Sequence, residues 1–134
     1  MSELWVDANI LLRFVTREPD DLFQRALRLV ERAERGEVTL RLSPLVVAEI
    51  VWVLKSFYQY SRTQIAEVLV PLVTAEGIAL QEADVVVAAL DSMARANVDF
   101  LDAFLAETVR REGGAVASFD RDFRRLEVTW IEPD

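Results

Sequence analysis

The chain alternates between short apolar runs and longer segments in which apolar residues recur every three or four positions. Short runs predict buried strands, and the longer spacing predicts helices that bury one face. Strands are predicted at residues 3–6, 38–43, 78–80, 115–119 and 128–132. Helices are predicted at residues 9–16, 20–36, 44–57, 62–77, 84–96 and 100–112, with a last helical turn at 121–126. Pro71 falls inside the fourth helical segment, where a kink or an early end is expected.

Strands that alternate with helices predict βαβ units, in which neighbouring strands run parallel and helices cover both faces of the sheet. We therefore expect an α/β fold, a three-layer α/β/α domain with a mostly parallel central sheet of about five strands. The length of 134 residues suits one domain over residues 1–134, and no internal repeat or linker interrupts the pattern.

The amino-acid composition limits the kinds of catalytic and metal sites that the chain can form. The chain contains no cysteine and no histidine, which excludes disulfides, thiolate metal sites and catalysis by Ser/His or Cys/His pairs. Carboxylates are then the main candidates for acid, base or metal chemistry. The absence of a long uncharged apolar run predicts no membrane span and no signal sequence, so a cytoplasmic location is expected.

The net charge of −8 argues against broad electrostatic attraction to nucleic acid or to an anionic membrane. Arginines are nevertheless bunched in places, and such local patches can hold phosphate. Three of them, Arg121, Arg124 and Arg125, follow Asp120 closely. We expect one or more of these arginines to face a phosphate group; pairing with surface acids is the alternative.

Asp7 and Asp120 each follow a predicted strand. Since the carboxyl ends of parallel strands share one edge of a sheet, these two carboxylates would meet there if their strands were neighbours. Each aspartate also suits the N-cap of the helix that follows, so capping is an alternative role. Asp122 lies two residues beyond Asp120, where an acid also suits the start of a helix.

Glu49 and Asp102 are candidates on helices. Glu49 has apolar neighbours at helical spacing, so it is expected to point into an apolar face, where a carboxylate needs a partner. An arginine or a metal ion would supply one. Asp102 lies three residues after Asp99, the expected N-cap, and an acid there suits the positive end of the helix.

Together Asp7, Glu49, Asp102 and Asp120 lie near helix starts that a parallel sheet would gather on one edge. Four such carboxylates would repel one another, and a hard divalent cation would relieve the repulsion. Mg²⁺, with Mn²⁺ as a substitute, suits oxygen ligands and phosphate chemistry. Asn9 is a nearby polar group that could orient a ligand or a bound water.

Four segments in order resemble the PIN-domain family and, within it, the VapC-type toxins of toxin–antitoxin pairs. They read "VDANILL", "SPLVVAEIVWVL", "DFLDAFLA" and "VASFDRDF". The resemblance implies a magnesium-dependent endoribonuclease that forms a homodimer and binds a cognate antitoxin, whose tail blocks the active-site groove. It matches the family's acidic residues to Asp7, Glu49, Asp102 and Asp120, a less constant acid to Asp122, and the polar residue after the first acid to Asn9.

Two other classes of function stay open. One is another metal-dependent phosphate enzyme or a phosphoacceptor domain, although the sole lysine, Lys55, lies inside a helix after Glu49. The other is a noncatalytic interaction domain in which the acids only cap helices. Exposed aromatics among Trp52, Phe57 and Tyr58 would suit a partner helix; ordinary core or rim positions are the alternative.

Overall fold

The computed structural model describes residues 2–134. The strands are β1 (Ser2–Trp5), β2 (Val38–Leu42), β3 (Ile78–Leu80), β4 (Val116–Ala117) and β5 (Trp130–Ile131). The helices are α1 (Ala8–Thr16), α2 (Asp20–Glu34), α3 (Pro44–Ser56), α4 (Arg62–Val73), α5 (Ala83–Ala96), α6 (Phe100–Glu112) and the 3₁₀ helix η1 (Arg121–Arg125). Every predicted element is present, and α4 ends two residues after Pro71, as a proline inside a helix predicts.

The pairing of the strands differs from the prediction. β1, β2 and β3 form a parallel three-stranded sheet in that order, whereas β4 and β5 form a separate parallel pair. All pairs are parallel, as expected, but the single central sheet of about five strands is not formed. The reason is that the apolar pattern predicts that a strand exists without specifying its partner. The two-residue β4 pairs with β5, which lies close to it in the chain.

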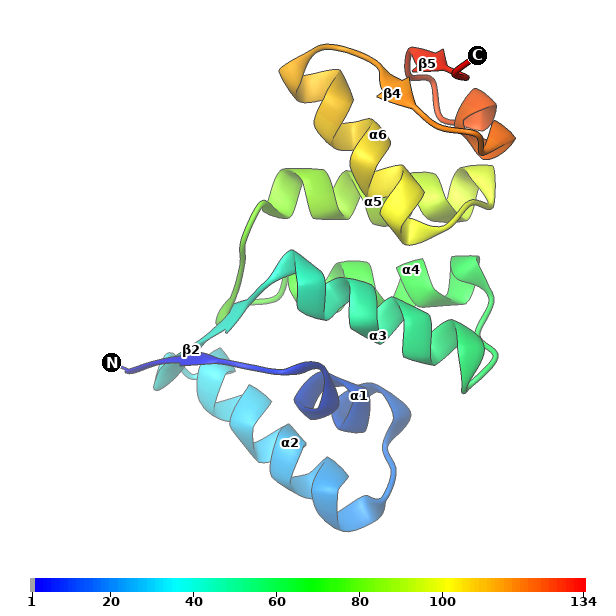
Figure 1. Ribbon diagram of the computed structural model, residues 1–134. Coiled ribbons are helices and arrows are strands. Elements are labelled where there is room, and N and C mark those ends of the chain that lie inside the picture. The colour runs from blue at the N-terminus through cyan, green and yellow to red at the C-terminus, as the bar shows by residue number, and fades with distance from the viewer. Residues whose placement is uncertain (1) are drawn as a thin grey trace.

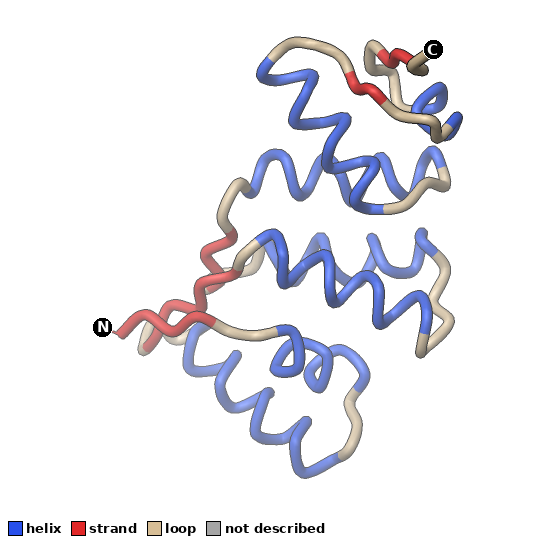
Figure 2. The backbone as a smooth tube through the Cα atoms, in the orientation of Figure 1, coloured by secondary structure: helices blue, strands red, loops and turns tan. Residues whose placement is uncertain are grey.

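The helices pack in succession along the molecule (Figure 1). α1 contacts α2 and α3, α3 contacts α4, α4 contacts α5, and α5 contacts α6. The three-stranded sheet lies at one side of this stack, and the β4–β5 pair lies beyond α6 at one end (Figure 2). This arrangement differs from the predicted sandwich with helices on both faces of one sheet.

Alternation along β2 explains how the three-stranded sheet is covered. Val38, Leu40 and Leu42 are buried against the helices. On the other face Arg41 donates to Glu3 at 2.8 Å and lies over the Trp5 ring at 5.0 Å. The sheet therefore has one apolar face, which packs against the helices. The opposite face carries an ion pair and a cation–π contact.

Leucine and isoleucine side chains from successive helices form the core. Fully buried examples are Leu11 of α1, Ile50 of α3, Leu69 of α4 and Leu90 of α5. Burying one such side chain contributes about 1.5–3 kcal/mol, so this continuous core holds the helices together. Within residues 2–134, no helix has both the length and the apolar character that crossing a bilayer requires.

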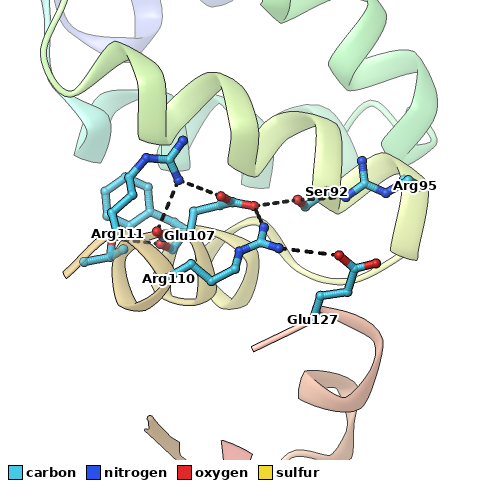
Figure 3. A network of polar contacts seen from close by, with 8 residues as sticks. Ser92, Arg95, Glu107, Arg110, Arg111 and Glu127 are labelled. Carbon is cyan, nitrogen blue, oxygen red and sulfur yellow. Dashed lines mark hydrogen bonds and ion pairs between the residues drawn. The ribbon is translucent and has the colours of Figure 1, made fainter. Parts of the chain in front are cut away.

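A buried polar network fixes α6 on α5 (Figure 3). Glu107 of α6 is only 4% exposed, and the Ser92 hydroxyl of α5 donates to its Oε1 at 3.0 Å. Arg110 donates to the same carboxylate, and Arg111 donates to its Oε2 at 2.7 Å. Arg110 also lies 3.7 Å from Glu127, in the segment before β5. The network therefore connects α5, α6 and the carboxyl-terminal segment.

We expect Glu107→Gln to destabilise the protein by about 1–3 kcal/mol, because the arginines and the Ser92 hydroxyl lose a charged acceptor. Ser92→Ala should cost about 0.5–1.5 kcal/mol for each of its two lost hydrogen bonds, one donated to Glu107 and one accepted from Arg95. Urea unfolding measures both changes. The control is Glu112→Gln on the same helix, which is exposed and should change stability by less than about 0.5 kcal/mol. Equal effects at positions 107 and 112 would contradict the role of the network.

Candidate metal centre

Three carboxylates meet where α6 begins and η1 begins. Asp102 lies in the first turn of α6, Asp120 is the N-cap of η1, and Asp122 lies in its first turn. Each offers one oxygen, and these oxygens all lie within 4.8 Å of one another. We call Asp102, Asp120 and Asp122 the aspartate triad. Its donors are all carboxylate oxygens, the ligand type that Mg²⁺, Ca²⁺ and Mn²⁺ prefer.

A reversal of the chain after α6 assembles the aspartate triad. Gly113 and Gly114 have φ angles of 91° and 104°, a region that favours glycine. They turn the chain so that β4 runs back beside α6 (Figure 1). Residues after β4 therefore arrive near the amino end of α6, where Asp102 lies.

Local hydrogen bonds hold the second half of the aspartate triad. Asp120 Oδ1 accepts from the backbone N–H of Asp122 at 2.8 Å, and the backbone N–H of Asp120 donates to Ser118 Oγ at 3.0 Å. Asp122 Oδ1 accepts from Arg125 at 2.6 Å. The capping role expected for Asp120 is thus present. A carboxylate has two oxygens, so Asp120 can cap through one and bind a cation through the other.

The electrostatics of the aspartate triad favour a bound cation. Partial burial raises the pKa of Asp102, and the negative charges of Asp120, Asp99 and Asp122 raise it further. A hydrogen bond with Asp120 acts in the same direction. A bound divalent cation would offset the negative charge of the aspartate triad, so the residues present fit a divalent metal.

Asp7 does not join the aspartate triad. It is the N-cap of α1, and its Oδ1 accepts from the backbone N–H of Ile10 at 3.2 Å. It would meet Asp120 only if β1 and β4 were neighbours, and these strands belong to different sheets. α1 and η1 lie far apart across the helix stack (Figure 1). Asn9, on α1, accepts from Arg13 Nε at 3.1 Å.

The expectation that Glu49 is buried is wrong. Glu49 is exposed and has no hydrogen bond or ion pair within residues 2–134. Two of its neighbours at helical spacing are exposed too, Leu45 at 79% and Trp52 at 67%, whereas Val46 and Val53 are partly buried. Helical spacing shows which residues share a face, but it does not show whether another element covers that face. α3 is apolar on several sides, and only some of them are packed.

The arginines after Asp120 have different surroundings. Arg125 pairs with Asp122, as already described, so it offsets part of the charge of the aspartate triad. Arg124 Nε donates to the Arg121 carbonyl at 3.4 Å. Arg121 is exposed and has no ion pair within residues 2–134, which leaves its guanidinium accessible.

Sequence reasoning missed two residues that support the aspartate triad. Ser118 accepts from the Asp120 backbone, while its own carbonyl accepts from Trp130 Nε1 at 2.9 Å, which ties the loop to β5. Glu107 holds α6 in place. The sequence contains a sign of this role, because arginines lie three and four residues after Glu107. Asp99, expected as a side-chain cap, instead binds Arg62 at 2.5 Å and makes no cap hydrogen bond.

The raised pKa of Asp102 predicts a pH dependence of stability in chelator. A carboxyl whose pKa is higher in the folded state contributes stability below its unfolded pKa of about 3.9, and this contribution is lost as pH rises through the folded pKa. Relative to Asp102→Asn, the wild type should therefore lose stability as pH rises from about 4 to 7. Urea unfolding of both proteins across this range measures the difference. If the wild type instead gains stability relative to Asp102→Asn over that range, the placement of Asp102 among other carboxylates is contradicted.

The comparisons with known proteins bear on the family of the chain. The PIN domain family model matches residues 4–128, and no curated protein matches the chain. PIN domains are in general metal-dependent nucleases, and the aspartate triad lies within the matched residues. Because the match covers nearly the whole sequence, the chain belongs to the PIN domain family.

Proposed function

We propose that this chain is a magnesium-dependent endoribonuclease formed by a single domain over residues 1–134, with Mn²⁺ able to replace Mg²⁺. The observation that carries the proposal is the aspartate triad in a chain of the PIN domain family. RNA as the substrate, and a role as the toxin of a type II toxin–antitoxin pair, rest on the resemblance of four segments to VapC-type toxins. Single-stranded or looped RNA is the proposed target, because unpaired bases are accessible.

In this proposal the chain's own residues hold the reacting groups. A divalent cation, when bound, polarises the scissile phosphodiester and neutralises the charge that develops on it. Asp120 and Asp122 present oxygens whose orientation their hydrogen bonds fix. Asp102, in the first turn of α6, accepts the proton of the attacking water. Arg121 and Arg124 hold the phosphate that enters.

We also propose Asp7 and Glu49 as further metal ligands, with Asn9 orienting a ligand or water. α3, which carries Glu49, packs against α6, which carries Asp102. For Asp7 the proposal requires that β1, an edge strand, approach the segment that carries Asp120. Trp5 is 58% exposed and Phe119 is 75% exposed, and each lies within two residues of one of these aspartates. Burying both rings would favour that approach.

A cytoplasmic location, a homodimer and a cognate antitoxin complete the proposal, and they rest on the same resemblance. Phe57, just after α3, is 75% exposed and packs edge-to-face on Tyr58 at 5.1 Å between ring centroids. Tyr58 is partly buried against the core, so Phe57 presents the exposed ring, and such a ring suits a partner helix.

The direct test is cleavage of a single-stranded RNA pool by purified protein freed of any partner. We expect cleavage with Mg²⁺ or Mn²⁺ and none in chelator. Asp102→Asn and Asp120→Asn should lower the rate by about 100- to 10,000-fold. Asp21→Asn, an exposed acid in the first turn of α2, is the matched control and should cleave normally. If the wild type and the triad variants behave alike, the enzyme reading fails.

One observation is also expected of a noncatalytic interaction domain. Asp7 and Asp120 both accept backbone hydrogen bonds at helix starts, as simple caps would. Caps require no metal, so a metal titration separates this alternative from the proposed nuclease.

The metal titration is read as thermal unfolding in chelator and in a magnesium series. Binding to the native state alone adds about 2.7 kcal/mol at one hundred times the dissociation constant, so the melting temperature of the wild type should climb. The climb should vanish in Asp120→Asn and shrink in Asp7→Asn and Glu49→Gln if these two complete the site. In chelator, Asp102→Asn should be neutral or stabilising, because it removes repulsion. A wild type indifferent to metal would support capping alone.

A further inference from the structure

A cavity of about 390 Å³ lies beside the aspartate triad, between α3, the start of α4, the end of α5 and the start of α6. Asp102 lines this cavity and also belongs to the triad, so the two are continuous. The volume falls within the range of about 300–1,000 Å³ that is typical of small-ligand sites. No residue of this cavity other than Asp102 has a role in the proposed function.

An exposed indole forms one wall of the cavity. Trp52 is 67% exposed, so its ring is open to a ligand. Met93 and Phe100 are buried beneath the same cavity. An open aromatic face over an apolar floor is the arrangement on which a nucleobase stacks.

Two cations also line the cavity. Lys55 lies three residues after Trp52 on α3, is exposed, and makes no ion pair within residues 2–134. Arg62 is held by Asn97 Oδ1 at 2.9 Å and Asp99 Oδ1 at 2.5 Å, so its guanidinium is fixed. Its Nε is buried without a hydrogen-bond partner. Asp99 pairs with Arg62, and Asp102 is the second carboxylate of the lining, so Lys55 is the cation of the cavity that has no ion pair within residues 2–134.

We propose that this cavity is a nucleotide subsite for single-stranded RNA, adjacent to the aspartate triad. The base stacks on Trp52, and the phosphate of the same nucleotide contacts Lys55 and Arg62. The neighbouring phosphate then reaches the side of the cavity where Asp102 lies. This inference rests on the proposed function, and it assigns to that function a substrate site that the aspartates alone do not provide.

The lining of the cavity favours RNA over a protein helix as the occupant. A helix that docks in a groove needs a mostly apolar wall, whereas this cavity mixes its apolar residues with a lysine, an arginine, two aspartates and a serine. In a chain with a net charge of −8, a free lysine next to an exposed indole gives local attraction for one phosphate.

The test measures binding of a labelled, single-stranded phosphorothioate oligoadenylate, which resists hydrolysis, by fluorescence anisotropy in Mg²⁺. Trp52→Ala should weaken binding by about 5- to 150-fold, the range expected for losing one base–aromatic stack. Trp52→Phe should retain most of the affinity, whereas Trp52→Leu should not, because only an aromatic ring stacks. Leu45→Ala, at an exposed apolar residue of the same helix outside the cavity, is the matched control and should bind normally. Lys55→Gln should lower the salt slope by about 0.7.

The outcomes separate this subsite from the proposed function. If the wild type binds the oligonucleotide and Trp52→Ala binds equally well, the subsite is wrong while the nuclease proposal stands. Full affinity in Trp52→Leu would overturn stacking and indicate a general apolar contact, as a docked protein helix would make. If the wild type neither binds nor cleaves RNA, both proposals fail.

Discussion

Mutual repulsion among three carboxylates is the constraint on which the rest of the site depends. Asp102, Asp120 and Asp122 present oxygens within 4.8 Å of one another, so the surrounding structure must supply the free energy that keeps them together. The buried hydrogen bond from Ser92 to Glu107 holds α6 on α5, and the Ser118 and Asp120 hydrogen bonds hold the start of η1. The free energy of packing thus opposes the electrostatic repulsion, and a cation would remove that conflict.

The elements of this fold could be predicted from sequence, but their assembly could not. Ser43 and Ser61 cap α3 and α4 as their positions predict, because capping depends on residues within one turn. Strand pairing depends on long-range contacts that leave little trace in a short apolar run. β4 offers only two paired residues, so nothing in its sequence distinguishes β5 from β1 as a partner. The separation of Asp7 from Asp120 follows from that pairing.

The candidate site could be predicted only in part, again because long-range contacts leave little trace in the sequence. Asp102 and Asp120 were found because each begins a helix, and helix starts are visible in sequence. Glu49 and Glu107 show the limit of the approach. Both have apolar neighbours at helical spacing, yet Glu49 is exposed and Glu107 is buried. What distinguishes them is compensation, since Glu107 has two arginines within one turn and Glu49 has none. A buried acid is therefore better recognised by its partners than by its apolar neighbours.

Capping and metal binding, which the sequence presents as alternatives, are compatible in this structure. A cap hydrogen bond engages one carboxylate oxygen and fixes the side-chain rotamer, and the second oxygen remains free. Because the rotamer is already fixed, the side chain loses less conformational entropy when a cation binds. Asp120 combines both features, since its Oδ1 caps η1 while its carboxylate belongs to the aspartate triad. A cap at the end of a strand can thus also hold a carboxylate ready for a metal ion, and evidence for capping does not argue against a metal site.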